Sequence, residues 1–78
     1  MSRAALDRID DAILVLLAER DEVVAALWAD KVAQGVPLRD AAREAELFVR
    51  VRSNAQERGM DPDAVEAVYR TFVGRRLR

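Results

Sequence analysis

The sequence contains no cysteine and no histidine, and its positive charge comes from twelve arginines and a single lysine, Lys31. Disulfides, a thiol nucleophile, an imidazole base and zinc ligation by cysteine or histidine are therefore excluded. The few hydroxyl groups have no imidazole to activate them; they belong to Ser2, Ser53, Tyr69 and Thr71. Any catalysis must rest on arginine, lysine, aspartate and glutamate, and we expect neither a metal nor a cofactor.

The chain also lacks a strong excess of charge and a long apolar run. Its 13 basic and 14 acidic residues nearly balance, so no net field attracts nucleic acid. The basic cluster Arg75, Arg76 and Arg78 fits a helix C-terminus. The longest apolar runs, Ala12–Ala18 and Val23–Ala29, are too short to span a bilayer, and a signal-peptide pattern is absent. We expect a cytoplasmic protein with no nucleic-acid or membrane partner.

Turn signals divide the chain into three predicted helices. Apolar residues three to four positions apart predict a first helix from about Arg3 to Gln34, about 45 Å long. Gly35 and Pro37 end this helix. A second helix is predicted from about Leu38 to Arg58, and Gly59 ends it.

The third helix begins at Asp61 and Pro62, a capping residue followed by a first-turn proline. Its apolar stripe consists of Val65, Val68, Phe72 and Val73. No segment alternates apolar and polar residues as a half-buried strand does. We therefore predict an all-α fold of one long and two shorter helices, in a single domain covering residues 1–78.

The first helix is too long for the two shorter helices to cover, because much of its length would project beyond a compact core. A chain this small also buries little surface by itself. The helix carries a heptad-like apolar seam, made of Leu6, Ile9, Ile13, Leu16, Val23 and Leu27. Such a seam favours an intertwined homodimer that pairs through the long first helix. The alternatives are an elongated monomeric hairpin and a coiled coil without a site.

Two cations, Arg20 and Lys31, occupy positions along this seam where apolar residues are expected. A buried charge needs an anion or water. Their separation of eleven residues is close to three helical turns, which places both on one face roughly 16 Å apart. The two side chains could therefore bind one small ligand. Alternatively, Arg20 reaches water or pairs with an acidic residue of another helix.

Three charged residues of the second helix, Asp40, Arg43 and Glu44, are three and four positions apart and share one face. That face continues through Leu47 toward the core. Alternatively, Asp40 is only a first-turn acid favoured by the helix dipole, and the other two are solvated surface residues.

The whole pattern resembles the all-helical AroQ-type chorismate mutases. The resemblance lies in Arg3, in LDRIDDAILVLLAER (Leu6–Arg20), in Lys31 and in GVPLRDAAREAEL (Gly35–Leu47). It covers nearly the entire chain, and it joins a helix pattern to a spaced set of charges. It implies a dimer of three-helix chains whose first helices pair, with each active site taking one arginine from the neighbouring subunit.

Arg3 matches that donated arginine. It precedes Arg20 by seventeen residues, which is about 25 Å along the helix and about 100° around it. The two side chains therefore cannot reach one ligand from the same helix, whereas an antiparallel partner brings Arg3 alongside. The predicted site has an excess of two positive charges, which suits a dicarboxylate; it contains Arg3, Arg20, Lys31, Asp40, Arg43 and Glu44.

The resemblance implies rearrangement of chorismate to prephenate in phenylalanine and tyrosine biosynthesis, a pericyclic step without covalent intermediate or proton transfer. The enzyme would select the compact diaxial conformer and stabilise negative charge on the breaking ether oxygen. Lys31 is expected at that oxygen, and Arg20 with the neighbour's Arg3 at the carboxylates. Glu44 and Asp40 match family positions that contact the ring hydroxyl and order the site.

In the same comparison Arg43 supports the cluster of charges, and Leu47 and Val73 form part of an apolar wall. The end of the sequence departs from the family, whose last helix presents a serine and, one turn later, a glutamine or protonated glutamate to the substrate. Arg76 takes the serine position here, and the glutamine would fall beyond Arg78. We expect slow turnover, or an activating pathway enzyme that orders this turn.

Three other interpretations remain open at this point. Isochorismate pyruvate lyases and aminodeoxychorismate mutases share the scaffold and most of the cations, and a non-catalytic dimerisation module could keep the same fold. The stretch PLRDAAREAEL (Pro37–Leu47) favours the mutase form of the second helix.

Overall fold

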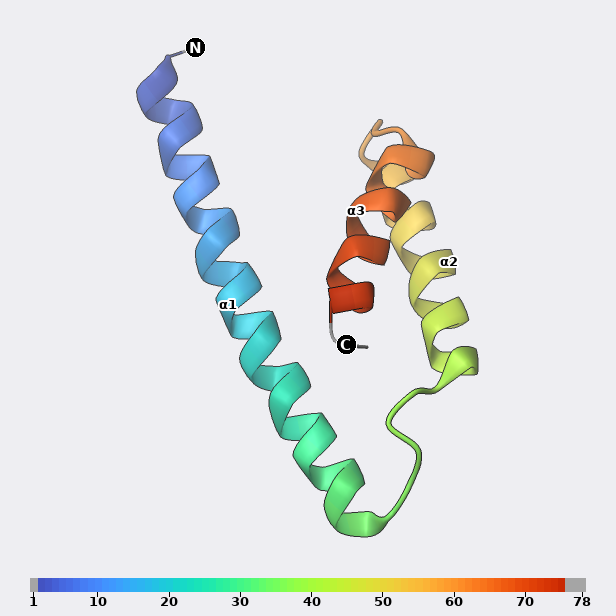
Figure 1. Cartoon of the computed structure of the whole chain (residues 1–78). Coiled ribbons are helices and arrows are strands. Elements are labelled where there is room, and N and C mark those ends of the chain that lie inside the picture. Colours follow the sequence, from blue (N-terminus) through green and yellow to red (C-terminus); the bar gives the residue numbers. More distant parts are fainter. Residues whose placement is uncertain (1, 76–78) are drawn as a thin grey trace. The chain divides into compact units, whose positions relative to one another are not determined.

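A computed structural model describes residues 2–75 of the chain, and every regular element within them is a helix. The elements are α1 (Arg3–Gln34), α2 (Ala41–Glu57) and α3 (Pro62–Arg75), shown in Figure 1. The predicted all-α class with one long and two shorter helices is confirmed. The described residues form two compact parts, which divide between Leu38 and Arg39. None of the helices described is both long and apolar enough to cross a membrane.

Helix α1 begins and ends at the predicted residues, and capping explains both ends. At the start, the Ser2 hydroxyl accepts the Ala5 N–H (3.2 Å), as an N-cap side chain does. At the end, Gly35 adopts the left-handed conformation (φ 70°, ψ 22°) that glycine enters without strain. The N–H groups of Gly35 and Val36 then turn back onto the carbonyls of Val32 and Lys31, both at 3.1 Å.

No residue of α1 is buried within this chain. The six seam residues are 48–62% exposed: Leu6, Ile9, Ile13, Leu16, Val23 and Leu27. Apolar side chains lie on other sides of the helix as well, because Leu14, Val15 and Val32 are 64–67% exposed. A helix with apolar residues on several sides is usually buried on several sides. The exposed apolar surface of α1 therefore extends beyond the seam.

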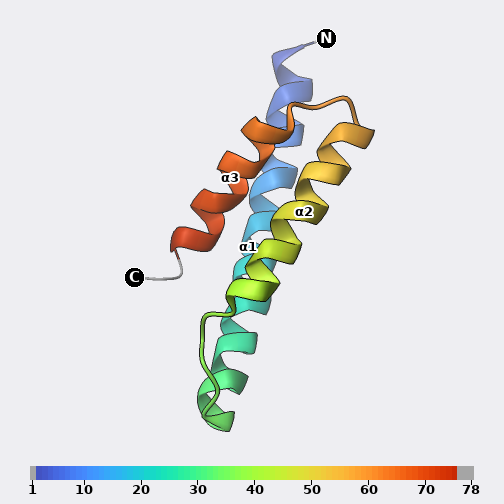
Figure 2. The same ribbon diagram turned by 90° about the vertical axis from the view of Figure 1, so that its right-hand side faces the viewer.

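Helices α2 and α3 form an antiparallel hairpin, which both views show side by side (Figures 1 and 2). Its best-buried residues are Val51 and Ala55, 7% and 3% exposed. Gly59 (φ 69°) ends α2, and the following N–H of Met60 bonds to the Ala55 carbonyl (2.9 Å). This is the glycine-dependent helix end that the sequence predicted.

Helix α3 begins as predicted, with the Asp61 carboxylate accepting the Asp63 N–H (2.9 Å) and Pro62 as its first residue. One member of the predicted apolar stripe differs, because Val68 is 51% exposed whereas Val65, Phe72 and Val73 are partly buried. The partly buried face also includes Tyr69, and Val68 points about 100° away from Tyr69 around the helix.

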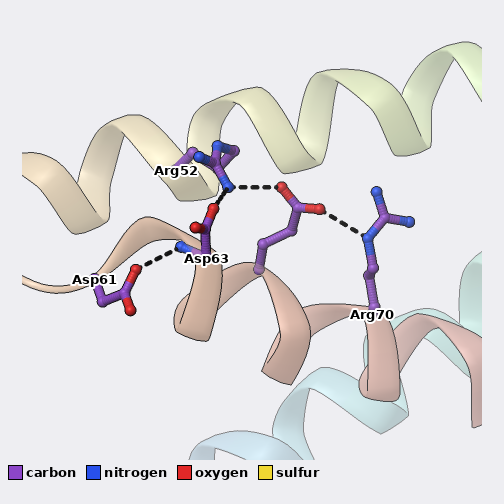
Figure 3. Close-up of polar contacts among 5 residues, drawn as sticks. Arg52, Asp61, Asp63 and Arg70 are labelled. Carbon is purple, nitrogen blue, oxygen red and sulfur yellow. Dashed lines mark hydrogen bonds and ion pairs between the residues drawn. The ribbon is translucent and has the colours of Figure 1, made fainter.

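An ion-pair network joins α2 to α3 (Figure 3). The Arg52 guanidinium donates from Nη1 to Asp63 Oδ1 (2.8 Å) and to Glu66 Oε1 (3.1 Å), while Glu66 Oε2 accepts from Arg70 Nε (2.8 Å). The Arg70 guanidinium also lies over the Phe48 ring, 4.2 Å from its centroid. The pKa of Glu66 is lowered by hydrogen bonds from Arg70, the larger cause, and from Arg52. The pKa of Arg52 is raised by its hydrogen bonds to Asp63, the larger cause, and to Glu66. Phe48 of α2 therefore contacts α3 through Arg70 and helps to hold the hairpin together.

Glu66→Gln tests this network through the pH dependence of stability. Because the folded pKa of Glu66 is lowered, its contribution is present above the pKa of an unfolded glutamate, about 4.3, and is lost as the pH falls through the folded pKa. We expect E66Q to melt below the wild type at neutral pH, with the gap shrinking toward pH 3, by circular dichroism. Glu57→Gln, at the exposed end of α2, is the control. A gap that stays constant over this range contradicts the assignment.

Candidate active site

The predicted site residues fall into two sets, one in each part of the chain. Arg3, Arg20 and Lys31 all lie on α1, so their spacing along one helix is fixed. Arg3 is the first helical residue and is exposed. Arg20 and Lys31 share one face about three turns apart, as the sequence predicted.

Lys31 lies in the last turn of α1, and the segment that follows holds both its backbone and its side chain. Its carbonyl oxygen accepts the Val36 N–H (3.1 Å), and its ammonium Nζ donates to the Leu38 carbonyl oxygen (3.3 Å). The left-handed Gly35 makes this return of the chain possible. An ammonium has three N–H groups. Because Leu38 accepts one, Lys31 is an oriented cation with donors left for a ligand.

Asp40 is the N-cap of α2, and the helix begins at Ala41 where the sequence predicted about Leu38. Asp40 has an extended backbone (φ −123°, ψ 98°), and its Oδ1 accepts the Arg43 N–H (3.1 Å). A short acidic side chain bonds a free N–H of the first turn most readily from just outside the helix. Asp40 therefore orders the start of α2.

Arg43 is turned toward a residue outside the predicted site. Its Nη1 pairs with Glu46 Oε2 at 3.1 Å, and the two side chains are 69% and 67% exposed. An exposed pair of this kind contributes about 0–1 kcal/mol. A ligand carboxylate could therefore replace Glu46 at little cost.

Glu44 is 22% exposed and pairs with Arg39, whose Nη2 lies 3.3 Å from Glu44 Oε2. The Glu44 backbone is fixed by the bond from its N–H to the Asp40 carbonyl (3.0 Å). Arg39 is not among the predicted site residues, because a separation of five residues does not place two side chains on one helix face. The sequence signal that could have indicated Arg39 is Asp40 as a helix N-cap. If Asp40 caps the helix, Arg39 lies just outside it, where helical spacing does not apply.

The remaining predictions concern the apolar wall, the C-terminus and metals. Leu47 and Val73 are partly buried in the second part of the chain. Arg76, which takes the family's serine position, and Arg78 lie outside the described residues. Within residues 2–75, no cluster of three acidic side chains could hold a metal ion.

A groove of about 550 Å³ runs along α2, and its described lining contains none of the predicted site residues. That lining consists of Ala42, Ala45, Glu46, Val49, Arg50, Ser53 and Asn54. All of these residues belong to α2 alone, so the groove lacks the converging polar groups of an active site.

Residues 2–75 match the sequence profile of the chorismate mutase type II family. The chain therefore belongs to this family of isomerases. It is 38% identical over 71 residues to the T-protein of Enterobacter agglomerans, covering 91% of this chain and 19% of that protein. It is 28% identical over 71 residues to the chorismate mutase of Methanocaldococcus jannaschii, covering 91% of this chain and 72% of that one. No solved structure matches the chain closely enough to count as a relative.

Gly35→Ala tests the turn that holds Lys31. Gly35 has a positive φ of 70°, and a left-handed conformation costs alanine about 1 kcal/mol. We expect the variant to lose about that much stability in urea unfolding. Gly74→Ala is the matched control, because Gly74 lies within α3 without a positive φ and an added Cβ meets nothing within 4 Å. Equal stability of the two variants contradicts the role given to Gly35.

Proposed function

We propose that this chain catalyses the rearrangement of chorismate to prephenate. The observation that carries the proposal is the oriented Lys31 ammonium, held by Leu38 and about three turns from Arg20 on one face of α1, in a chain whose family is chorismate mutase type II. A rearrangement that needs no acid, base or nucleophile suits a chain without histidine and cysteine. Its substrate, a dicarboxylate, suits a site with excess positive charge.

The proposed mechanism is electrostatic. Arg20 and the Arg3 of a second copy bind the two carboxylates and favour the compact conformer, because a planar guanidinium can hold a carboxylate by two bonds. Lys31 donates to the ether oxygen as its bond to carbon breaks and negative charge gathers there. The contact with Leu38 (3.3 Å) sets the ammonium before the substrate arrives, so little reorganisation is needed in the transition state.

The acidic residues complete this proposal. Glu44 accepts a hydrogen bond from the ring hydroxyl, while Asp40 keeps α2 capped so that Glu44 stays in its first turn. Arg43 exchanges its surface partner Glu46 for the charge cluster. Leu47 and Val73 supply the apolar wall of the ring pocket.

The active form in this proposal is a homodimer. The exposed apolar sides of α1 support it, because an exposed apolar surface that extends along a whole helix marks an interface. Its position at the start of α1 lets the exposed Arg3 extend into the site of an antiparallel partner. A cytoplasmic location and an activating pathway enzyme stay predictions; the second rests on residues 76–78, outside the described part of the chain.

Lys31→Ala tests the mechanism. Loss of the donor at the developing negative charge is expected to lower kcat for prephenate formation about 100- to 1,000-fold. The assay follows the disappearance of chorismate and identifies the product, with isochorismate and aminodeoxychorismate run in parallel. Asp30→Asn, an exposed neighbour on α1, serves as the control. Unchanged turnover in the Lys31 variant contradicts the mechanism, and absence of prephenate with wild-type protein contradicts the function.

A mixing experiment tests the shared site. Arg3→Ala and Lys31→Ala are each expected to be inactive, but a mixed dimer has one site with both residues intact. After unfolding and refolding together in equal amounts, we expect about one quarter of wild-type activity.

The matched control mixes Arg20→Ala with Lys31→Ala. The proposal places these two residues in one site from one protomer, so no mixed dimer contains an intact site. Recovery in this control as strong as in the first mixture contradicts the donation of Arg3 across the interface.

A further inference from the structure

Arg39, in the segment before α2, makes a contact that the proposed mechanism does not use. Its Nη2 lies 3.3 Å from Glu44 Oε2, and its side chain is 62% exposed against 22% for Glu44. Arg39 contacts Glu44, whereas Arg43 pairs with Glu46. Arg39 therefore places a positive charge beside the Glu44 carboxylate.

The contact also limits how Glu44 can be oriented. The Asp40 carbonyl oxygen accepts the Glu44 N–H (3.0 Å), which fixes the Glu44 backbone, and Arg39 directly precedes this N-cap residue. Arg39 then holds one carboxylate oxygen, Oε2. The second oxygen, Oε1, remains as an acceptor for a ligand group.

We propose that Arg39 is a positioning and specificity residue that makes Glu44 select a hydroxyl rather than an ammonium on the substrate ring. This inference rests on the proposed function, in which Glu44 binds the ring hydroxyl. A carboxylate already paired with a guanidinium still accepts a hydrogen bond from a neutral hydroxyl. An ammonium in the same place gains less from the paired carboxylate and is repelled by Arg39.

Arg39→Gln and Arg39→Lys test the proposal, with aminodeoxychorismate as the amino analogue of chorismate. We expect R39Q to lower kcat/KM for chorismate about fivefold and to tighten inhibition by the amino analogue by a similar factor, the size expected for partly exposed charges. R39K keeps the charge and restores most of the discrimination. Arg50→Gln, an exposed arginine six residues beyond Glu44 on α2, is the charge-matched control and should behave as wild type.

A double-mutant cycle separates positioning through Glu44 from a general effect of charge or stability. In the Glu44→Gln background, R39Q should change neither kcat/KM nor inhibition further, because the partner carboxylate is gone. Additive effects, or an R39Q variant that behaves like R50Q, overturn the proposal for Arg39 and leave the mutase function standing. If the wild type forms no prephenate, the proposed function fails, and the role of Arg39 fails with it.

Discussion

Helix α1 has no buried residue, and this exposure governs how the molecule can be stable and build a site. Thirty-two residues of helix carry apolar side chains on several sides, and a hairpin with Val51 and Ala55 as its best-buried residues is a small core. A domain of this size buries a smaller fraction of its surface than a large one does, and its stability is correspondingly small. The same helix carries Arg3, Arg20 and Lys31. In the proposed homodimer, a second copy of α1 would both cover part of this apolar surface and supply Arg3 to the site.

A rigid helix suits electrostatic catalysis because it fixes the spacing of its charges before the substrate binds. The cations of α1 cannot move independently along the axis, and Lys31 is further fixed by the turn that Gly35 permits. Preorganised charges stabilise a transition state without reorganising at the moment of reaction. The proposed rearrangement moves no proton, so it does not require the histidine or cysteine that this sequence lacks.

Most of the fold could be predicted from local signals. Gly35, Gly59 and the Asp61–Pro62 pair act within one turn of the chain, so their effect on the helix ends is visible in the sequence. The start of α2 could be predicted less accurately. An aspartate such as Asp40 fits either an N-cap or a first-turn position, and only its backbone conformation distinguishes the two. The network of Arg52 with Glu66 requires two helices to pack, which local spacing does not reveal.

The arrangement of the candidate site residues could be predicted only where helical spacing governs it. Arg20 and Lys31 follow from the period of α1, but Arg39 reaches Glu44 across the helix start, where no period applies. Such contacts are individually weak, about 0–1 kcal/mol for exposed pairs. Such a contact acts mainly by orienting the side chain. A carboxylate with one oxygen bound presents the other oxygen in a limited set of orientations. In this scaffold the segment between α1 and α2 orients a charge on each side, Lys31 through Leu38 and Glu44 through Arg39. Loss of either side-chain contact should therefore alter activity more than it alters stability.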